Sequence, residues 1–163
     1  MKRASIFIIL IISFFVFQCC VGPQKSIGIS DGDVPPNTNT TIVETEMDAA
    51  TAYRTVAQIL LNRGYTFHST DETLKSISTE FKGISQRWGV DYTFVRIGVN
   101  IQGESNAKAI VRGWYKTIEN KSDETGQRIR KYGQNGSPVR DAWLELYNVA
   151  TKIGGVLKFE KLF

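Results

Sequence analysis

The sequence predicts an α+β fold: a two-layer sandwich with an antiparallel sheet of four or five strands and two main helices on one face. Two segments carry apolar residues at helical spacing, and the segment between them alternates apolar and polar residues in two long runs. Both cysteines lie near the N-terminus, so the folded region has no disulfide framework. The expected order is β-α-β-β-β-β-α, with room for a terminal strand.

The first strand and the first helix are predicted between residues 41 and 64. Residues 41–44 favour a short strand. Thr45 and Asp48 then match a capping box, which opens a helix that ends at a left-handed Gly64. The core-facing stripe of this helix consists of Ala49, Ala52, Tyr53, Val56 and Leu60.

A hairpin is expected next. Residues 65–69 form its first strand, residues 70–73 its turn and residues 74–81 its second strand, followed by a loop over residues 82–89. The second strand is expected to present one side made of Ile77, Thr79 and Phe81.

The strongest strand signals lie in residues 91–102 and 107–118, which we expect to pair as an antiparallel hairpin. In the first run, apolar residues alternate from Val95 to Ile101. In the second run, one face carries Ile110, Arg112, Trp114 and Lys116.

The second helix is predicted after a polar stretch, residues 119–136, in which residues 127–132 favour a short helix. Ser137 and Pro138 supply its N-cap and its first helical residue. The helix ends at the glycine pair 154–155, and the alternating tail favours an edge strand. Its core-facing stripe consists of Val139, Ala142, Trp143, Leu146, Ala150 and Ile153.

The N-terminus predicts export. Lys2 and Arg3 precede an apolar run over residues 6–17, which is typical of a secretory signal. A stretch rich in Gly, Pro, Asn and Ser follows and suits a flexible tether. The expected division is a signal peptide at 1–19, a tether at 20–40 and one domain at 41–163.

The adjacent Cys19 and Cys20 directly follow the apolar run, and this arrangement resembles the signal peptide of bacterial lipoproteins. The resemblance implies cleavage and acylation at Cys20, with Cys19 as the other choice, and a membrane anchor formed by the lipid. Without an aspartate after the cysteines, it implies a cell-envelope location at the outer membrane, facing the periplasm. An uncleaved signal anchor, and ordinary cleavage after Gly22, are the alternatives.

Composition argues against several classes of function. The net charge of +4 falls to +2 without Lys2 and Arg3, which gives weak support for nucleic-acid binding. The single histidine, His68, excludes a histidine pair for zinc, and the common catalytic motifs are absent. We therefore expect no enzyme activity, no cofactor, no metal and no nucleic-acid partner.

The stretch 132–137 is interpreted as a loop that leads into the cap of the second helix, with anion binding as the alternative.

Partner binding is the function that the remaining residues favour. Trp114 shares a strand face with Arg112 and Lys116, and an exposed tryptophan beside cations is a common hot-spot composition. If a helix covered that face, Trp114 would instead join Trp143 in the core. Arg128 and Arg130 form a basic group nearby that could contact lipid headgroups, an acidic glycan or an acidic protein, or simply keep the loop soluble.

The domain also resembles small periplasmic lipoprotein domains of the BamC type, on the pattern Ala52-Tyr53-x-x-Val56 followed by Gly64-Tyr65 and a hairpin. This resemblance implies an accessory role in an envelope assembly, with another envelope protein as partner and no catalysis. The alternative function is a module that holds an apolar ligand or lipid between helix and sheet.

Overall fold

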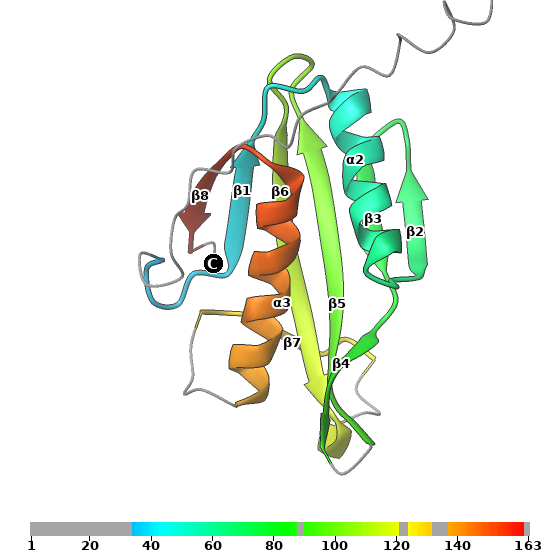
Figure 1. Cartoon of the computed structure of the whole chain (residues 1–163), viewed down its shortest axis with the longest axis vertical. Helices are drawn as coiled ribbons and strands as arrows, with labels where there is room; N and C mark the ends of the chain where they lie inside the picture. Colours follow the sequence, from blue (N-terminus) through cyan, green and yellow to red (C-terminus); the bar gives the residue numbers. More distant parts are fainter. Residues whose placement is uncertain (1–33, 88–89, 121–123, 132–136, 162–163) are drawn as a thin grey trace, which may run out of the picture.

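The protein is an α+β domain in which one antiparallel sheet carries two helices (Figure 1). The structure, a computed structural model, describes residues 34–87, 90–120, 124–131 and 137–161. The elements in chain order are β1 (Thr40–Glu44), α2 (Ala49–Asn62), β2 (Phe67–Asp71), β3 (Ser76–Thr79), β4 (Lys82–Arg87), β5 (Val90–Gln102), β6 (Lys108–Thr117), the 3-10 turn η2 (Ile118–Asn120), β7 (Gln127–Arg128), α3 (Pro138–Ile153) and β8 (Val156–Glu160).

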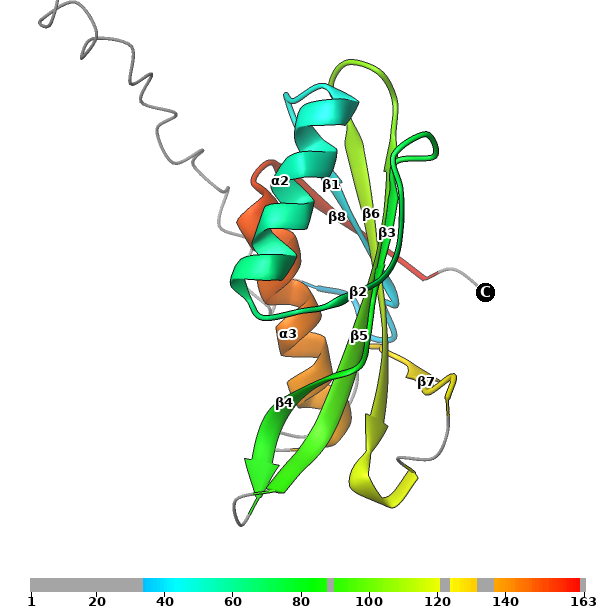
Figure 2. The ribbon, with the colours of Figure 1, turned by 90° about the vertical axis from the view of Figure 1, so that its right-hand side faces the viewer.

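The sheet is built around the long hairpin of β5 and β6. Its strand order is β2-β3-β5-β6-β1-β8, with β4 also paired to β5 and β7 also paired to β6. Figure 2 shows both helices on the same side of this sheet. The sheet therefore has an inner face, which packs against α2 and α3, and an outer face without a helix among the described residues.

The sheet has eight strands, so the prediction of four or five strands was wrong. β5 has 13 residues but pairs β3 over three positions, and β4 pairs the rest of that edge. In the same way, β1 and β7 share one edge of β6. The predicted loop at 82–89 and the predicted helix at 127–132 are therefore partly strand, and the tail forms the edge strand β8.

Two local predictions also differ from the structure. The N-cap of α2 is Asp48, whose Oδ1 accepts from Thr51 N at 2.9 Å, whereas the Thr45 hydroxyl donates to Ala107 O. Phe81 does not share a side with Ile77. The register of the chain against β5 shifts after β3, because Ile97 N donates to the Thr79 hydroxyl at 3.0 Å and not to a backbone carbonyl.

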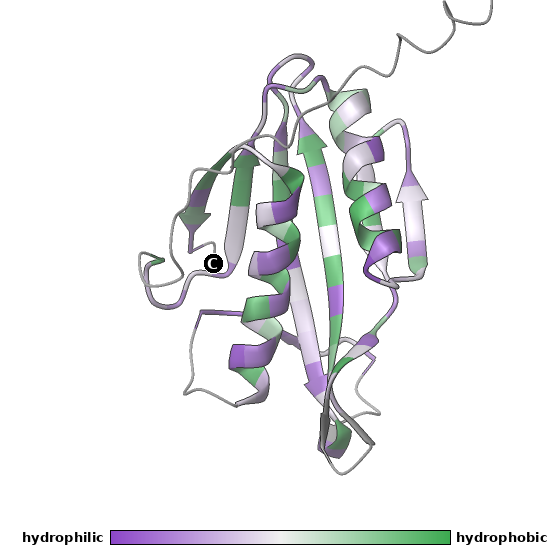
Figure 3. Ribbon diagram, viewed as in Figure 1, coloured by the Kyte–Doolittle hydropathy of each residue, from purple (hydrophilic) through white to green (hydrophobic). Residues whose placement is uncertain are grey.

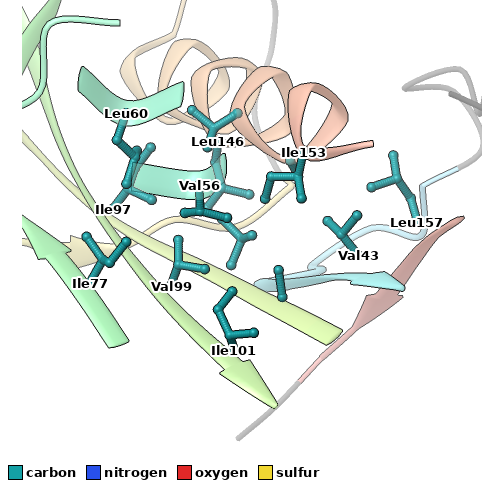
Figure 4. Close-up of a cluster of buried hydrophobic side chains, with 14 of the residues drawn as sticks. Val43, Val56, Leu60, Ile77, Ile97, Val99, Ile101, Leu146, Ile153 and Leu157 are labelled. Carbon is teal, nitrogen blue, oxygen red and sulfur yellow. The ribbon is translucent and has the colours of Figure 1, made fainter. Parts of the chain in front are cut away.

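The inner face forms the core. Figure 3 shows the hydrophobic and hydrophilic bands that alternate along β5, and Figure 4 shows the apolar side chains of strands and helices meeting between the layers. The predicted stripes of both helices are confirmed except at Val139, which is half-buried and lies outside the core; Trp143 and Leu60 are fully buried. Gly113 permits the close approach of α3, since a Cβ there would lie 2.8 Å from Leu146 Cδ1.

The packed domain starts before the predicted boundary at residue 41. Val34 is 2% exposed and belongs to the hydrophobic core. Asn37 N donates to Lys131 O at 3.0 Å, and Lys131 N donates to Thr38 O at 2.7 Å. This exchange ties the lead-in of β1 to the segment that follows β7.

The two tryptophans on opposite sides of the sheet predict different losses of stability. Trp143→Ala empties a fully buried site and is expected to lower the free energy of unfolding by about 3–5 kcal/mol. Trp114→Ala removes a half-buried side chain from the outer face and is expected to cost about 1 kcal/mol. Urea denaturation followed by far-ultraviolet circular dichroism measures both. Equal losses would mean that the outer face is covered.

Candidate functional site

The outer face of the central hairpin presents cations and aromatic rings together. Val95, Ile97 and Val111 point to the inner face, so the alternating residues of β5 and β6 point outward. We call the group that results the outer-face cluster. It consists of Phe81, Arg96, Arg112, Trp114 and Lys116.

Arg96 holds this cluster together. Its guanidinium carbon lies 4.9 Å from the centre of the Phe81 ring and 5.1 Å from that of Trp114. Lys116 Nζ lies 4.3 Å from the centre of the same Phe81 ring. Contacts of this kind are attractive because the faces of aromatic rings are electron-rich. The segment before β7 covers part of the cluster: Arg96 Nη2 donates to Thr125 O at 3.2 Å, and a Cβ at Gly126 would lie 2.8 Å from Phe81 Cζ. The side chains of the cluster are therefore half-buried and held in place.

Trp114 lies flat on the sheet. A Cβ built at Gly98 would lie 3.2 Å from Trp114 Cζ3, so the ring occupies the space that a side chain at position 98 would take. A hollow of about 200 Å³ lies beside the ring, with Ser78, Asn100 and Arg112 among its lining residues. The site therefore offers a flat apolar surface with polar groups at its margin.

β7 extends the basic surface across the edge of β6. Arg128 pairs opposite Trp114, and its Nη2 donates to the Thr40 hydroxyl at 3.2 Å. Burial, together with the charges of Arg112 and Arg130, lowers the pKa of Arg128. The guanidinium is therefore held among like charges.

A larger cleft of about 730 Å³ lies next to β7. Its lining combines residues of β7 and the chain after it with one residue each from the lead-in of β1, from β6 and from the first turn of α3. The lining residues are Asn37, Tyr115, Gln127, Arg128, Arg130 and Val139. Tyr115 Oη donates to Gln127 Oε1 at 2.9 Å, which orients the amide of Gln127.

The arginines of this basic surface are not paired with carboxylates among the described residues. Within the described ranges, no ion pair joins a carboxylate to Arg96, Arg112, Arg128 or Arg130. Glu44 lies at the far end of β1, where Lys158 at 2.8 Å and Lys108 at 3.2 Å lower its pKa. Arg63 and Tyr65 bind the other prominent acid, Glu145, on the helix layer.

The structure divides the predicted partner-binding residues into two places. Trp114, Arg112 and Lys116 share one face, as their spacing predicted, and this face is the outer one, away from Trp143. Arg128 joins this face to the cleft, and Arg130 lines the cleft. A helix at 127–132 would have separated these two arginines, whereas the extended chain brings both to the cleft.

Sequence reasoning missed Arg96 and Phe81 as members of the site. Arg96 alternates with the buried residues of β5, which was a usable signal for its outward position. Phe81 had no such signal, because the shift between β3 and β4 decides which face its ring joins.

The other predicted groups are separate from this surface or lie outside the described residues. His68 Nδ1 lies 2.7 Å from Glu80 Oε1, and both side chains are more than half exposed. Cys19, Cys20 and most of the stretch 132–137 fall outside the described ranges. In the part of the chain that is described, three or more His, Cys, Asp or Glu side chains do not gather as a metal site, and no helix is long and apolar enough to cross a membrane.

Comparison with known proteins gives little beyond this geometry. No protein-family model matches the chain, and no curated protein matches it. A search of solved structures finds similarity to a crystal structure of a DUF4468 family protein from Bacteroides ovatus ATCC 8483. The TM-score is 0.34 and the identity 14%, with 82% of this chain and 85% of that chain covered. A similarity at this level carries no argument about function.

Proposed function

We propose that this chain is a lipid-anchored protein of the cell envelope, at the outer membrane facing the periplasm, whose domain binds another envelope protein and has no catalytic role. The observation that carries the binding role is the outer-face cluster, in which a flat Trp114 is surrounded by cations. Aromatic and arginine side chains contribute most of the binding energy at many protein interfaces.

The charges define the surface that the partner presents. Arg96 and Arg112 have no carboxylate in ion-pair contact among the described residues, so an acidic partner supplies the missing opposite charge. Charge complementarity of this kind sets the orientation and the rate of association. The alternative, an apolar ligand between helix and sheet, requires the buried side chains of Figure 4 to move apart.

The anchor is tested by intact mass. Protein purified from its own membrane fraction is expected to have the mass of a chain that is cleaved before one cysteine and carries acyl chains, because the acylated cysteine becomes the first residue once the signal peptide is removed. A Cys19→Ala/Cys20→Ala variant is expected to lack both changes. An unmodified full-length mass in the native protein would contradict lipidation and indicate a signal anchor.

The binding surface is tested by charge reversal. Arg112→Glu places an acid in the cluster and is expected to weaken recovery of a cross-linked partner from the envelope at least tenfold, as truncation of a charge pair costs about 2–5 kcal/mol. Arg54→Glu is the matched control, since Arg54 is exposed on α2 in the helix layer. Equal recovery with both variants would exclude the outer face as the binding surface.

A further inference from the structure

The cleft beside β7 is a second candidate site that the outer-face cluster does not require. It opens at the edge of β6 where β1 begins, and its volume of about 730 Å³ falls in the usual range for small-molecule sites. Its position is set by the chain around Ile129. Ile129 is fully buried, and its N donates to Gly113 O at 2.9 Å.

The alternation of an extended chain places the two arginines. Because successive side chains of such a chain point to opposite sides, the residues before and after Ile129 both turn away from the core. Both line the cleft as Arg128 and Arg130. The backbone exchange between Lys131 and the lead-in of β1 holds the main chain of this segment in place, and the Thr40 hydroxyl accepts from Arg128 Nη2 at 3.2 Å.

The lining matches a doubly charged anion. Two guanidiniums supply two permanent positive charges, and each has the planar fork that binds phosphate oxygens in pairs. Asn37 and Gln127 add amide groups, and the ring of Tyr115 and the side chain of Val139 add apolar wall. The lowered pKa of Arg128, which burial and its arginine neighbours cause, indicates that a bound anion would relieve repulsion there.

We propose that this cleft binds a phosphate monoester, held by Arg128 and Arg130. The ester belongs either to a soluble small molecule or to a lipid headgroup, and both share the dianionic phosphate that the two arginines recognise. The proposal goes beyond the proposed function, since it needs neither the N-terminal lipid nor the protein partner.

Calorimetric titration with glycerol phosphate tests the soluble form. Saturable binding is expected, with a dissociation constant that rises about tenfold or more in Arg130→Gln, because charge-assisted hydrogen bonds are lost. Arg130 is exposed, so this variant is expected to fold; Arg130→Lys keeps the charge without the fork and is expected to fall between the two. Arg54→Gln, with the same charge change on α2, is expected to bind like the wild type.

Vesicles distinguish the lipid source. If the ester belongs to a lipid headgroup, the protein is expected to bind phosphatidylcholine vesicles containing phosphatidic acid, a monoester, more tightly than vesicles containing phosphatidylglycerol, a diester. Arg130→Gln is expected to remove this difference. Saturable binding of glycerol phosphate without this difference assigns the site to a soluble ester. The proposal would be overturned if neither assay showed saturable binding, or if Arg54→Gln weakened binding as much as Arg130→Gln does. It would also be overturned if succinate, a dianion without phosphate, bound as tightly as glycerol phosphate.

Discussion

The long antiparallel hairpin of β5 and β6 is the constraint on which the rest of the structure depends. Its register pairs Ile97 with Gly113 on the inner face and Arg96 with Trp114 on the outer face. The strict alternation of the two strands then decides which side the helices cover. A shift of the register by one residue would exchange the two faces, because side chains alternate with period two.

The two layers meet through shape as well as hydrophobicity. Gly113 leaves room for Ile129 on one side and Leu146 on the other, where a Cβ would lie 2.6 Å and 2.8 Å from their Cδ1 atoms. The next residue towards the N-terminus of α3, Glu145, binds Arg63 at the C-cap of α2 and accepts from Tyr65 Oη at 3.1 Å. Burial, followed by the charge of Glu145, raises the pKa of Tyr65, which keeps this hydroxyl a donor.

Local signals in the sequence predicted the helices and the central hairpin. The apolar stripes of α2 and α3, the Ser137 cap and the alternation of β5 and β6 each depend on residues close together in the chain. The strands β4 and β7 were missed because they form on the unpaired edges of longer strands. Residues 127–131 carry one apolar side chain, Ile129, among polar neighbours, and its strand conformation depends on distant partners at Gly113 and Thr38.

The same distinction applies to the candidate site. The shared face of Trp114, Arg112 and Lys116 followed from the spacing within one strand, whereas the side of the sheet that the helices cover did not. The contribution of Phe81 and the joint position of Arg128 and Arg130 required the packing of segments far apart in the sequence. The result is a domain whose helix layer completes the core and whose outer sheet face carries the clustered cations and aromatic rings.

Hydroxyl-radical footprinting in the native envelope, compared with the purified protein, tests most directly whether the open sheet face is the binding surface. Phe81 and Trp114 report on the outer face, whereas Leu61 and Leu144 report on the exposed side of the helix layer. The account predicts that oxidation of Phe81 and Trp114 falls in the envelope while that of Leu61 and Leu144 stays the same. Protection of Leu61 and Leu144 with unchanged oxidation of Trp114 would contradict it.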